Sequence, residues 1–220
     1  MNRRLDPAIM HIMPSANLQK SIAIILDQIA GQGYAVAKDF LSHKEVCALA
    51  LAAKTLHASG EMKKATTGLT RTITQPIRGD LIHWLEEDQA SEAETPYLDA
   101  MEELQDAMNQ HFFLGLFELE SHFAIYPPGA AYQKHLDQFI GKDERKVSAI
   151  LYLNESWQAQ DGGALRMYLD KKDDSNFIDI LPAAGTLVVF LSSDFLHEVL
   201  PAKRERISVT AWFRTRSLNA

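Results

Sequence analysis

The chain has 220 residues, of which 46% are hydrophobic and 23% are charged, as in an ordinary globular domain. Its formal net charge of -7 argues against duplex nucleic acid or an anionic membrane surface as a main partner, because both attract a basic face. No stretch approaches the roughly 18 apolar residues of a membrane span, and the single cysteine, Cys47, cannot form an internal disulfide. We therefore expect one cytoplasmic domain over residues 1–220, working as a monomer.

The first predicted helix is indicated by apolar residues that recur at helical spacing from Leu18 to Ile29. Asn17 is a candidate N-cap, and Gly31 and Gly33 are candidate stops, because glycine tolerates the backbone conformation that often ends a helix. We expect the helix to lie between these signals.

Two further helices are predicted before residue 117. Ser42 and Glu45 have the spacing of a capping box, so a second helix should begin there. A third should open at Thr95–Pro96, because proline is favoured in a first helical turn. Its expected buried face consists of Leu98, Met101, Leu104, Met108 and Phe112. Between these helices, residues 60–80 are polar and rich in Lys and Thr, and we expect a long loop with room for a short hairpin.

From residue 118 onward, short apolar runs alternate with turn signals such as Pro127-Pro128-Gly129. The runs predict strands over residues 119–126, 147–153, 164–169, 177–181, 186–191, 197–200 and 206–214. Short strands at this spacing suggest a sandwich or barrel, and helices that precede them suggest packing on one outer face of a sheet pair. We expect an α+β fold, with helical support in residues 1–117 and a β-rich core in 118–215.

A candidate metal site begins with His135 and Asp137. Residues two apart on an extended chain point to the same side, so the imidazole and the carboxylate can converge on one ion. His197, at the start of a later strand, is the best candidate for a third ligand. Two histidines and one carboxylate are the donor set of non-haem Fe(II) oxygenases, in which open positions remain for cosubstrate and oxygen. Zinc accepts the same ligands, so a zinc-dependent hydrolase is an alternative.

The last predicted strand carries a candidate anion anchor. One of its faces presents Arg206, Ser208, Thr210 and Trp212. An arginine inside a barrel is costly unless an anion meets it, and a guanidinium holds a carboxylate bidentately, with Ser208 as a further donor. A dicarboxylate that reaches from iron to Arg206 is 2-oxoglutarate. The alternatives are a solvated basic turn that includes Arg206, and a non-enzymatic barrel that binds a small acid; succinate formation would distinguish turnover from binding.

The assembled motifs resemble the prolyl-hydroxylase branch of the Fe(II)- and 2-oxoglutarate-dependent dioxygenases, the group of the hypoxia-inducible-factor prolyl hydroxylases and their bacterial relatives. The resemblance covers about residues 75–214. The matching motifs are Ile77-Arg78-Gly79-Asp80, Tyr126-Pro127, Tyr132, His135-x-Asp137, Tyr152-Leu153-Asn154, Gly162-Gly163-x-Leu165-Arg166, His197-Glu198-Val199 and Arg206-x-Ser208-x-Thr210-x-Trp212. The resemblance implies a double-stranded β-helix, which is a jelly-roll or cupin-like fold.

The resemblance also implies roles for individual residues. Tyr152 would bond the remote carboxylate of 2-oxoglutarate beside Arg206, and three residues would line the same pocket: Tyr126, Ile150 and Leu165. Arg78, Asp80 and Arg145 match loop positions that bear on protein substrates, and Asp80 is expected to pair with Arg145 across the entrance. Trp212 matches an aromatic residue near the substrate proline.

The activity implied by the resemblance is hydroxylation of a prolyl residue, coupled to conversion of 2-oxoglutarate and O2 to succinate and CO2. Fe(II) would be the metal, and L-ascorbate a candidate reductant. A cytoplasmic protein of the translation machinery is a candidate substrate, whereas free amino acids and other small molecules remain alternatives. The chain departs from the animal enzymes in a shorter turn between Tyr126 and His135, and it ends soon after the last predicted strand, so their protein substrate does not carry over.

The remaining histidines have no evident partners in the sequence. For His43 and His122 we expect ordinary surface or satisfied core positions. Cys47, on the second predicted helix, is expected to be a small buried hydrophobic residue.

Overall fold

The computed structural model describes residues 16–65, 78–138 and 144–216. Its elements, in chain order, are α1 (Ala16–Gln32), β1 (Tyr34–Ala37), α2 (His43–Ala58), β2 (Lys63–Lys64), β3 (Leu81–Leu85), η1 (Glu87–Gln89), α3 (Thr95–Phe112), β4 (Glu118–Tyr126), β5 (Tyr132–His135), β6 (Arg145–Tyr152), η2 (Ala159–Asp161), β7 (Leu165–Tyr168), β8 (Phe177–Ile180), β9 (Leu187–Leu191), β10 (His197–Val199) and β11 (Arg206–Arg214). None of the described helices is long and apolar enough to cross a membrane.

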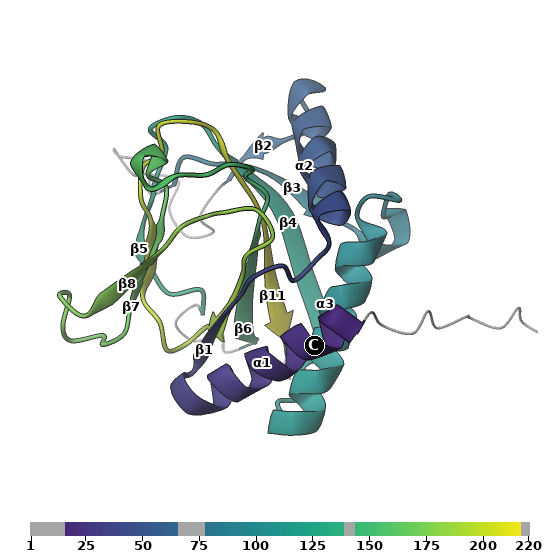
Figure 1. The fold of residues 1–220 in the computed structure, drawn as a ribbon, viewed down its shortest axis with the longest axis vertical. Helices are drawn as coiled ribbons and strands as arrows, with labels where there is room; N and C mark the ends of the chain where they lie inside the picture. The colour runs from purple at the N-terminus through teal and green to yellow at the C-terminus, as the bar shows by residue number, and fades with distance from the viewer. Residues whose placement is uncertain (1–15, 66–77, 139–143, 217–220) are drawn as a thin grey trace, which may run out of the picture.

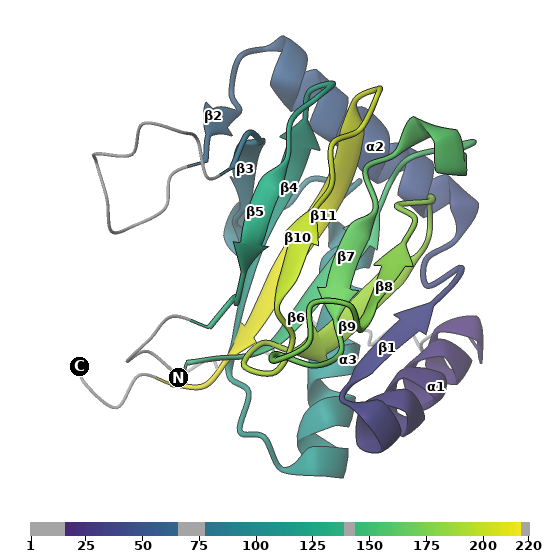
Figure 2. The same ribbon diagram turned by 90° about the vertical axis from the view of Figure 1, so that its left-hand side faces the viewer.

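Two antiparallel sheets face each other. The larger, here called the major sheet, has the strand order β1-β9-β6-β11-β4-β3-β2, and the smaller, the minor sheet, has the order β5-β10-β7-β8. The helices lie on the outer face of the major sheet, and the minor sheet covers part of its other face (Figures 1 and 2). This arrangement confirms the expected double-stranded β-helix with helices packed on one sheet.

Strand β11 shows how the sequence directs the two faces of the major sheet. Ile207, Val209 and Phe213 join the apolar core between the sheet and the helices, where Met101 and Leu104 of α3 also lie. The alternate residues of β11 point into the space between the sheets, because side chains along a strand alternate sides. Strand β11 is hydrogen-bonded to β4 on one side and β6 on the other, so its inward face forms the centre of that space.

The helix boundaries follow the predicted signals with two exceptions. The N–H of Glu45 donates to Ser42 Oγ at 3.3 Å, and the N–H of Ser42 donates to Glu45 Oε2 at 2.8 Å, so the predicted capping box opens α2. Helix α1 continues to Gln32 and is followed by Gly33 in the left-handed conformation, with φ of 79°. Since α1 begins at Ala16, Asn17 lies inside the helix and is not its N-cap, and Gly31 does not stop it.

The predicted buried face of α3 is correct at its centre. Met101, Leu104 and Met108 are buried, while Leu98 and Phe112 are only partly covered. Tyr97 is almost fully buried, and its hydroxyl lies 3.2 Å from the Ser121 hydroxyl of β4. The spacing of apolar residues alone did not indicate Tyr97, because its hydroxyl is polar and can be buried only with a hydrogen-bond partner.

The prediction that strands begin only after residue 117 is wrong. Strands β1, β2 and β3 come earlier in the chain and extend both ends of the major sheet. Strand β1 has only four residues and two buried positions, which is too short to show a clear period. The two residues of β2 pair antiparallel with β3, which lies beyond the predicted loop, so this pairing is not a short hairpin within residues 60–80. Residues 66–77 of the predicted loop, including Ile77, lie outside the described residues.

Candidate active site

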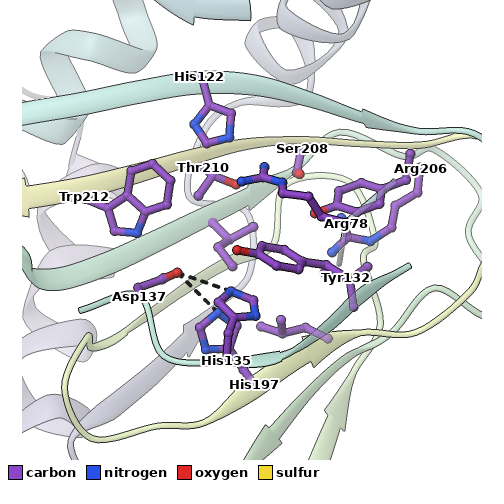
Figure 3. Close-up of a pocket in the computed structure, with 14 residues that line it drawn as sticks. Arg78, His122, Tyr132, His135, Asp137, His197, Arg206, Ser208, Thr210 and Trp212 are labelled. Atoms are coloured by element: carbon purple, nitrogen blue, oxygen red, sulfur yellow. Dashed lines mark ion pairs between the residues drawn. The ribbon is translucent and has the colours of Figure 1, made fainter. Parts of the chain in front are cut away.

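A pocket opens between the two sheets, and Figure 3 shows its side chains. Strands β4, β5, β6, β7, β10 and β11 all contribute to it, together with Arg78 and Asp137 outside the strands. The lining residues are Arg78, His122, Tyr126, Tyr132, His135, Asp137, Ile150, Leu165, His197, Val199, Arg206, Ser208, Thr210 and Trp212.

The three predicted metal ligands meet at one point of this pocket. His135 ends β5 and His197 begins β10, and the two residues are opposite each other in the antiparallel pairing of these strands. Asp137 Oδ1 lies 3.4 Å from His135 Nε2 and 3.6 Å from His197 Nε2. Figure 3 shows the three side chains turned toward one another. Two imidazole nitrogens and one carboxylate oxygen thus converge as the sequence predicts.

Backbone carbonyls orient both imidazoles. His135 Nδ1 lies 2.7 Å from the Gln133 carbonyl oxygen, and His197 Nδ1 lies 3.1 Å from that of Phe195. A carbonyl oxygen can only accept, so each Nδ1 carries the proton and each Nε2 presents its lone pair toward Asp137. Such contacts behind the ligands fix ring orientation in metal sites.

The protonation states also fit a divalent cation. Burial raises the pKa of Asp137, but the nearby imidazoles of His197 and His135 and a hydrogen bond from Ser148 outweigh burial and hold that pKa far below its usual range. Ser148 Oγ donates to Asp137 Oδ2 at 2.7 Å. Burial lowers the pKa of His197 to about 4, despite the opposing effect of Asp137. An ionised carboxylate and a neutral imidazole are the forms that bind metal.

Arg206 is a buried cation at another part of the pocket. The residue is 1% exposed, and its Nε donates to the Gly163 carbonyl at 2.9 Å. Its guanidinium carbon lies 5.1 Å from the ring centre of Tyr126 and 5.0 Å from that of Tyr152. Gly163 has φ of +69°, and a Cβ there would lie 3.3 Å from Arg206 Cδ and 2.8 Å from Ala202 Cβ. A glycine is therefore needed for this close approach.

Two buried hydrogen-bond donors without a partner in the described part of the chain indicate that the site around Arg206 can bind an anion. Arg206 Nη2 and the Tyr152 hydroxyl are both buried and have no hydrogen-bond partner among the described residues. Burial raises the pKa of Tyr152 to about 12, although Arg206 opposes the effect, so the phenol is a donor at neutral pH. Buried donors without partners are costly, and a carboxylate would satisfy both. The pocket thus offers metal ligands at His135, Asp137 and His197, and carboxylate-binding donors at Arg206 and Tyr152.

Three of the other predicted cofactor-binding residues, Tyr126, Ile150 and Leu165, line the pocket, and so does Ser208. Tyr152 is fully buried beside Arg206 and is not one of the lining residues. The structure therefore brings the whole predicted set to the same region, on three neighbouring strands of the major sheet (β6, β11 and β4) and on β7 of the minor sheet.

Among the predicted substrate residues, Arg78 and Trp212 line the pocket, but the charged residues pair differently from expectation. Arg78 binds Asp80 through two hydrogen bonds, from Nε at 2.7 Å and from Nη2 at 2.5 Å. Arg145 binds Glu120 at 2.9 Å and stacks over Trp212, with its guanidinium carbon 3.6 Å from the ring centre. The expected pair between Arg145 and Asp80 is wrong, because each has a nearer partner of opposite charge.

His122 is a pocket residue that the sequence reasoning missed. It is 2% exposed, stacks on Trp212 at 5.2 Å between ring centres, and has no partner for Nδ1 among the described residues. Burial lowers its pKa to about 3, so the ring is neutral. It is therefore not a satisfied core histidine. Its position two residues before Ala124 and four before Tyr126 on β4 places it on the inward face, and this alternation could have revealed it.

Comparison with known proteins agrees with this geometry. The model of the 2OG-Fe(II) oxygenase superfamily matches residues 121–214. The hypoxia-inducible factor prolyl hydroxylase of Caenorhabditis elegans is 36% identical over 151 residues, which are 64% of this chain but 20% of that relative, so this chain spans a fifth of its length. The crystal structure of a Pseudomonas putida prolyl-4-hydroxylase is 48% identical, with a TM-score of 0.80 over 89% of this chain and 100% of that one.

A further similar structure is that of a Trichoplax adhaerens prolyl hydroxylase in complex with a hypoxia inducible factor oxygen degradation domain peptide fragment. It is 25% identical to this chain, with a TM-score of 0.80, and the match covers 92% of this chain and 94% of that one.

Proposed function

The chain belongs to the 2OG-Fe(II) oxygenase superfamily, within its prolyl hydroxylase branch, and from that membership we propose that it hydroxylates a prolyl residue of a protein or peptide. The same reaction would convert 2-oxoglutarate and O2 to succinate and CO2. One observation carries the proposal: a two-histidine, one-carboxylate donor set shares a pocket with a buried arginine whose Nη2 has no described partner.

Each part of the pocket has a task in this proposal. His135, Asp137 and His197 hold Fe(II), while Arg206 and Tyr152 bind the remote carboxylate of 2-oxoglutarate, with Ser208 as a further donor. The wall formed by Tyr126, Ile150 and Leu165 keeps the cosubstrate in place and excludes water. Iron and 2-oxoglutarate supply the activation of oxygen, and the protein supplies orientation.

Two unpartnered atoms support a substrate with peptide groups. Among the described residues, His122 Nδ1 and Trp212 Nε1 are buried in the pocket wall without a hydrogen-bond partner. Arg206 is paired with Tyr126 and not with His122 across β4 and β11, so these two atoms are separate from the proposed carboxylate anchor. An indole N–H can only donate, so a carbonyl oxygen is its natural partner. A peptide that lays a prolyl ring against Trp212 presents such an oxygen, whereas a purely apolar molecule does not.

The peptide class also agrees with the relatives. The Trichoplax structure holds a peptide fragment, and we propose the same class of substrate here. The ion pairs of Arg78 with Asp80 and of Arg145 with Glu120 leave charged side chains of both signs beside the pocket. A cytoplasmic protein of the translation machinery is the first substrate to test.

The test incubates the purified protein with Fe(II), 2-oxoglutarate, L-ascorbate and proteins from a lysate depleted of small molecules. We expect succinate to form, and peptide mass spectrometry to find one added oxygen on proline. Asp137→Asn and Arg206→Met proteins are the controls and should produce neither. A hydroxyl on lysine, asparagine or a free amino acid would retain the oxygenase and overturn the prolyl assignment. Absence of succinate under all conditions would overturn the oxygenase activity itself.

A further inference from the structure

A second group of potential metal ligands lies outside the pocket. His43, Cys47 and Glu155 each offer one ligand atom, and these atoms all lie within 4.8 Å of one another. None of the three lines the pocket. We propose that they form a second metal site, which takes Zn2+ or another thiophilic divalent cation.

Two of the ligands come from one turn of a well-capped helix. His43 is the first residue of α2 and Cys47 lies four positions later, so both side chains project from the same face. The capping box between Ser42 and Glu45 fixes the backbone of this turn. The imidazole and the thiol are thus presented together before any metal binds.

The third ligand is held by the frame of the β-sheets. Glu155 follows Asn154, whose side-chain amide donates to the carbonyls of Pro182 at 2.8 Å and Ile207 at 2.9 Å. The N–H of Ile207 donates back to Asn154 Oδ1 at 2.6 Å. Arg204 Nη2 donates to the Glu155 carbonyl at 2.9 Å. These four bonds fix the backbone from which the Glu155 carboxylate reaches α2.

The distances match a tetrahedral ion. With bonds of about 2.3 Å to sulfur and about 2.0 to 2.1 Å to nitrogen and oxygen, ligand atoms around zinc lie roughly 3.3 to 3.6 Å apart. Cys47 Sγ is 3.6 Å from His43 Nε2, and that nitrogen is 3.5 Å from Glu155 Oε1. The remaining edge, Sγ to Oε1, is 3.0 Å because the thiol donates a hydrogen bond there. Replacing that proton by a metal would lengthen this edge toward the others.

The ligand chemistry distinguishes this site from the pocket. Thiolate, imidazole and carboxylate together favour zinc, whereas the pocket has no sulfur ligand. Binding would release the thiol proton to solvent, with no change in oxidation state. The side chains of His43 and Glu155 are 81% and 56% exposed, so water can complete the coordination and the ion can exchange. The bound ion would join the start of α2 to the turn after β6.

Cobalt(II) is the probe of choice, because a thiolate bound to Co(II) gives a near-ultraviolet charge-transfer band that nitrogen and oxygen ligands do not give. Metal-free protein is titrated with CoCl2 in a non-thiol reductant. We expect the band in the wild-type protein and also in Asp137→Ala, which lacks a pocket ligand. Cys47→Ser should abolish it, and ZnCl2 should displace it. If the Asp137 variant does not fold, wild-type protein preloaded with Mn(II) replaces it.

Two variants test whether three ligands act together. Loss of a direct ligand should cost more than the about 10- to 100-fold typical of outer-shell partners, so His43→Ala and Glu155→Gln should each weaken Co(II) binding at least that much. Zn2+ should also raise the Tm of Asp137→Ala protein but not of the Asp137→Ala, Cys47→Ser double variant. No charge-transfer band in the wild type, or unchanged affinity in both His43→Ala and Glu155→Gln, would overturn the site. The pocket and its 2-oxoglutarate turnover would be unaffected by that result.

Discussion

Arg206→Met is expected to separate the function of this residue from its contribution to stability. In the structure Arg206 is buried, makes one hydrogen bond to a carbonyl, and has an unpartnered Nη2. Methionine has a similar length and no charge, so it fills the space without leaving a large cavity. The change removes the cation and leaves the surrounding strands in place.

The expected effects on stability and binding have opposite directions. Replacing buried ions by apolar side chains of similar volume is often neutral or stabilising by about 1 to 4 kcal/mol, so the Tm of the variant without ligand should equal or exceed that of the wild type. Losing one partner of a buried charged pair costs about 2 to 5 kcal/mol of binding free energy. At 1.4 kcal/mol per tenfold change, the Kd of 2-oxoglutarate should rise about 30- to 4,000-fold.

Calorimetric titration of Mn(II)-loaded protein measures the Kd, and thermal melts report the stability. Ligand at 100 times its Kd should stabilise the wild type by about 2.7 kcal/mol, which is a Tm increase of about 5 to 11 °C for a chain of this size. At that concentration the variant should be stabilised by at most about 0.9 kcal/mol, a Tm increase of no more than about 4 °C. Arg166→Met is the matched control, because Arg166 pairs with Asp179 on β8 and does not line the pocket. A variant that loses several kcal/mol of stability yet binds 2-oxoglutarate normally would refute the assignment.

Three further outcomes are expected. Asp137→Asn should keep the fold but lose stoichiometric Fe(II) or Mn(II), measured by metal analysis after gel filtration; retained metal would contradict the ligand set. Burial lowers the pKa of His122 to about 3 in the folded protein, whereas in the unfolded chain the pKa is about 6.5. As the pH falls below about 6.5, His122 is therefore protonated in the unfolded chain but not in the folded protein, so the free energy of unfolding declines. Between pH 6.5 and 4, the free energy of unfolding measured by urea denaturation should therefore fall less in His122→Met than in the wild type, by up to about 3 kcal/mol; the same pH dependence in both proteins would be inconsistent with a neutral buried ring. Arg145→Ala removes the cation over Trp212, so it should reduce hydroxylation of added protein while sparing substrate-free succinate formation; equal losses of both would indicate damage to the pocket.

Residues with strong local chemistry could be predicted from the sequence. The faces of β11 followed from simple alternation, and both Arg206 and Phe213 lie where that pattern put them. His135 and Asp137 could be paired from their spacing, although Asp137 lies just beyond the end of β5. His197 was found only because the chemistry required a third ligand. In the structure, the pairing of β5 with β10 puts it opposite His135.

Features that depend on the choice among several partners could not be predicted. Arg145 has the right charge to pair with Asp80, but in the structure it pairs with Glu120 of β4, at 2.9 Å between Nη2 and Oε2. Cys47 was expected to be buried, yet it is half-exposed and bonds Glu155 across a sequence separation that no local pattern reports. The early strand β3 was missed because its residues are only partly covered, so apolar alternation is weak there.

The two ends of the pocket belong to different sheets. The histidines lie on β5 and β10 of the minor sheet, while Arg206 lies on β11 of the major sheet. The guanidinium crosses the layer between the sheets and binds the carbonyl of Gly163, just before β7 of the minor sheet, so the packing between the sheets positions the cation relative to the metal ligands. Because the two ends come from different elements of a packed core, we expect a diacid one carbon shorter or longer than 2-oxoglutarate to engage both ends less well. Leu165 packs between the sheets and lines the pocket, so we expect a change in its volume to alter the preference for acid length without removing a polar contact.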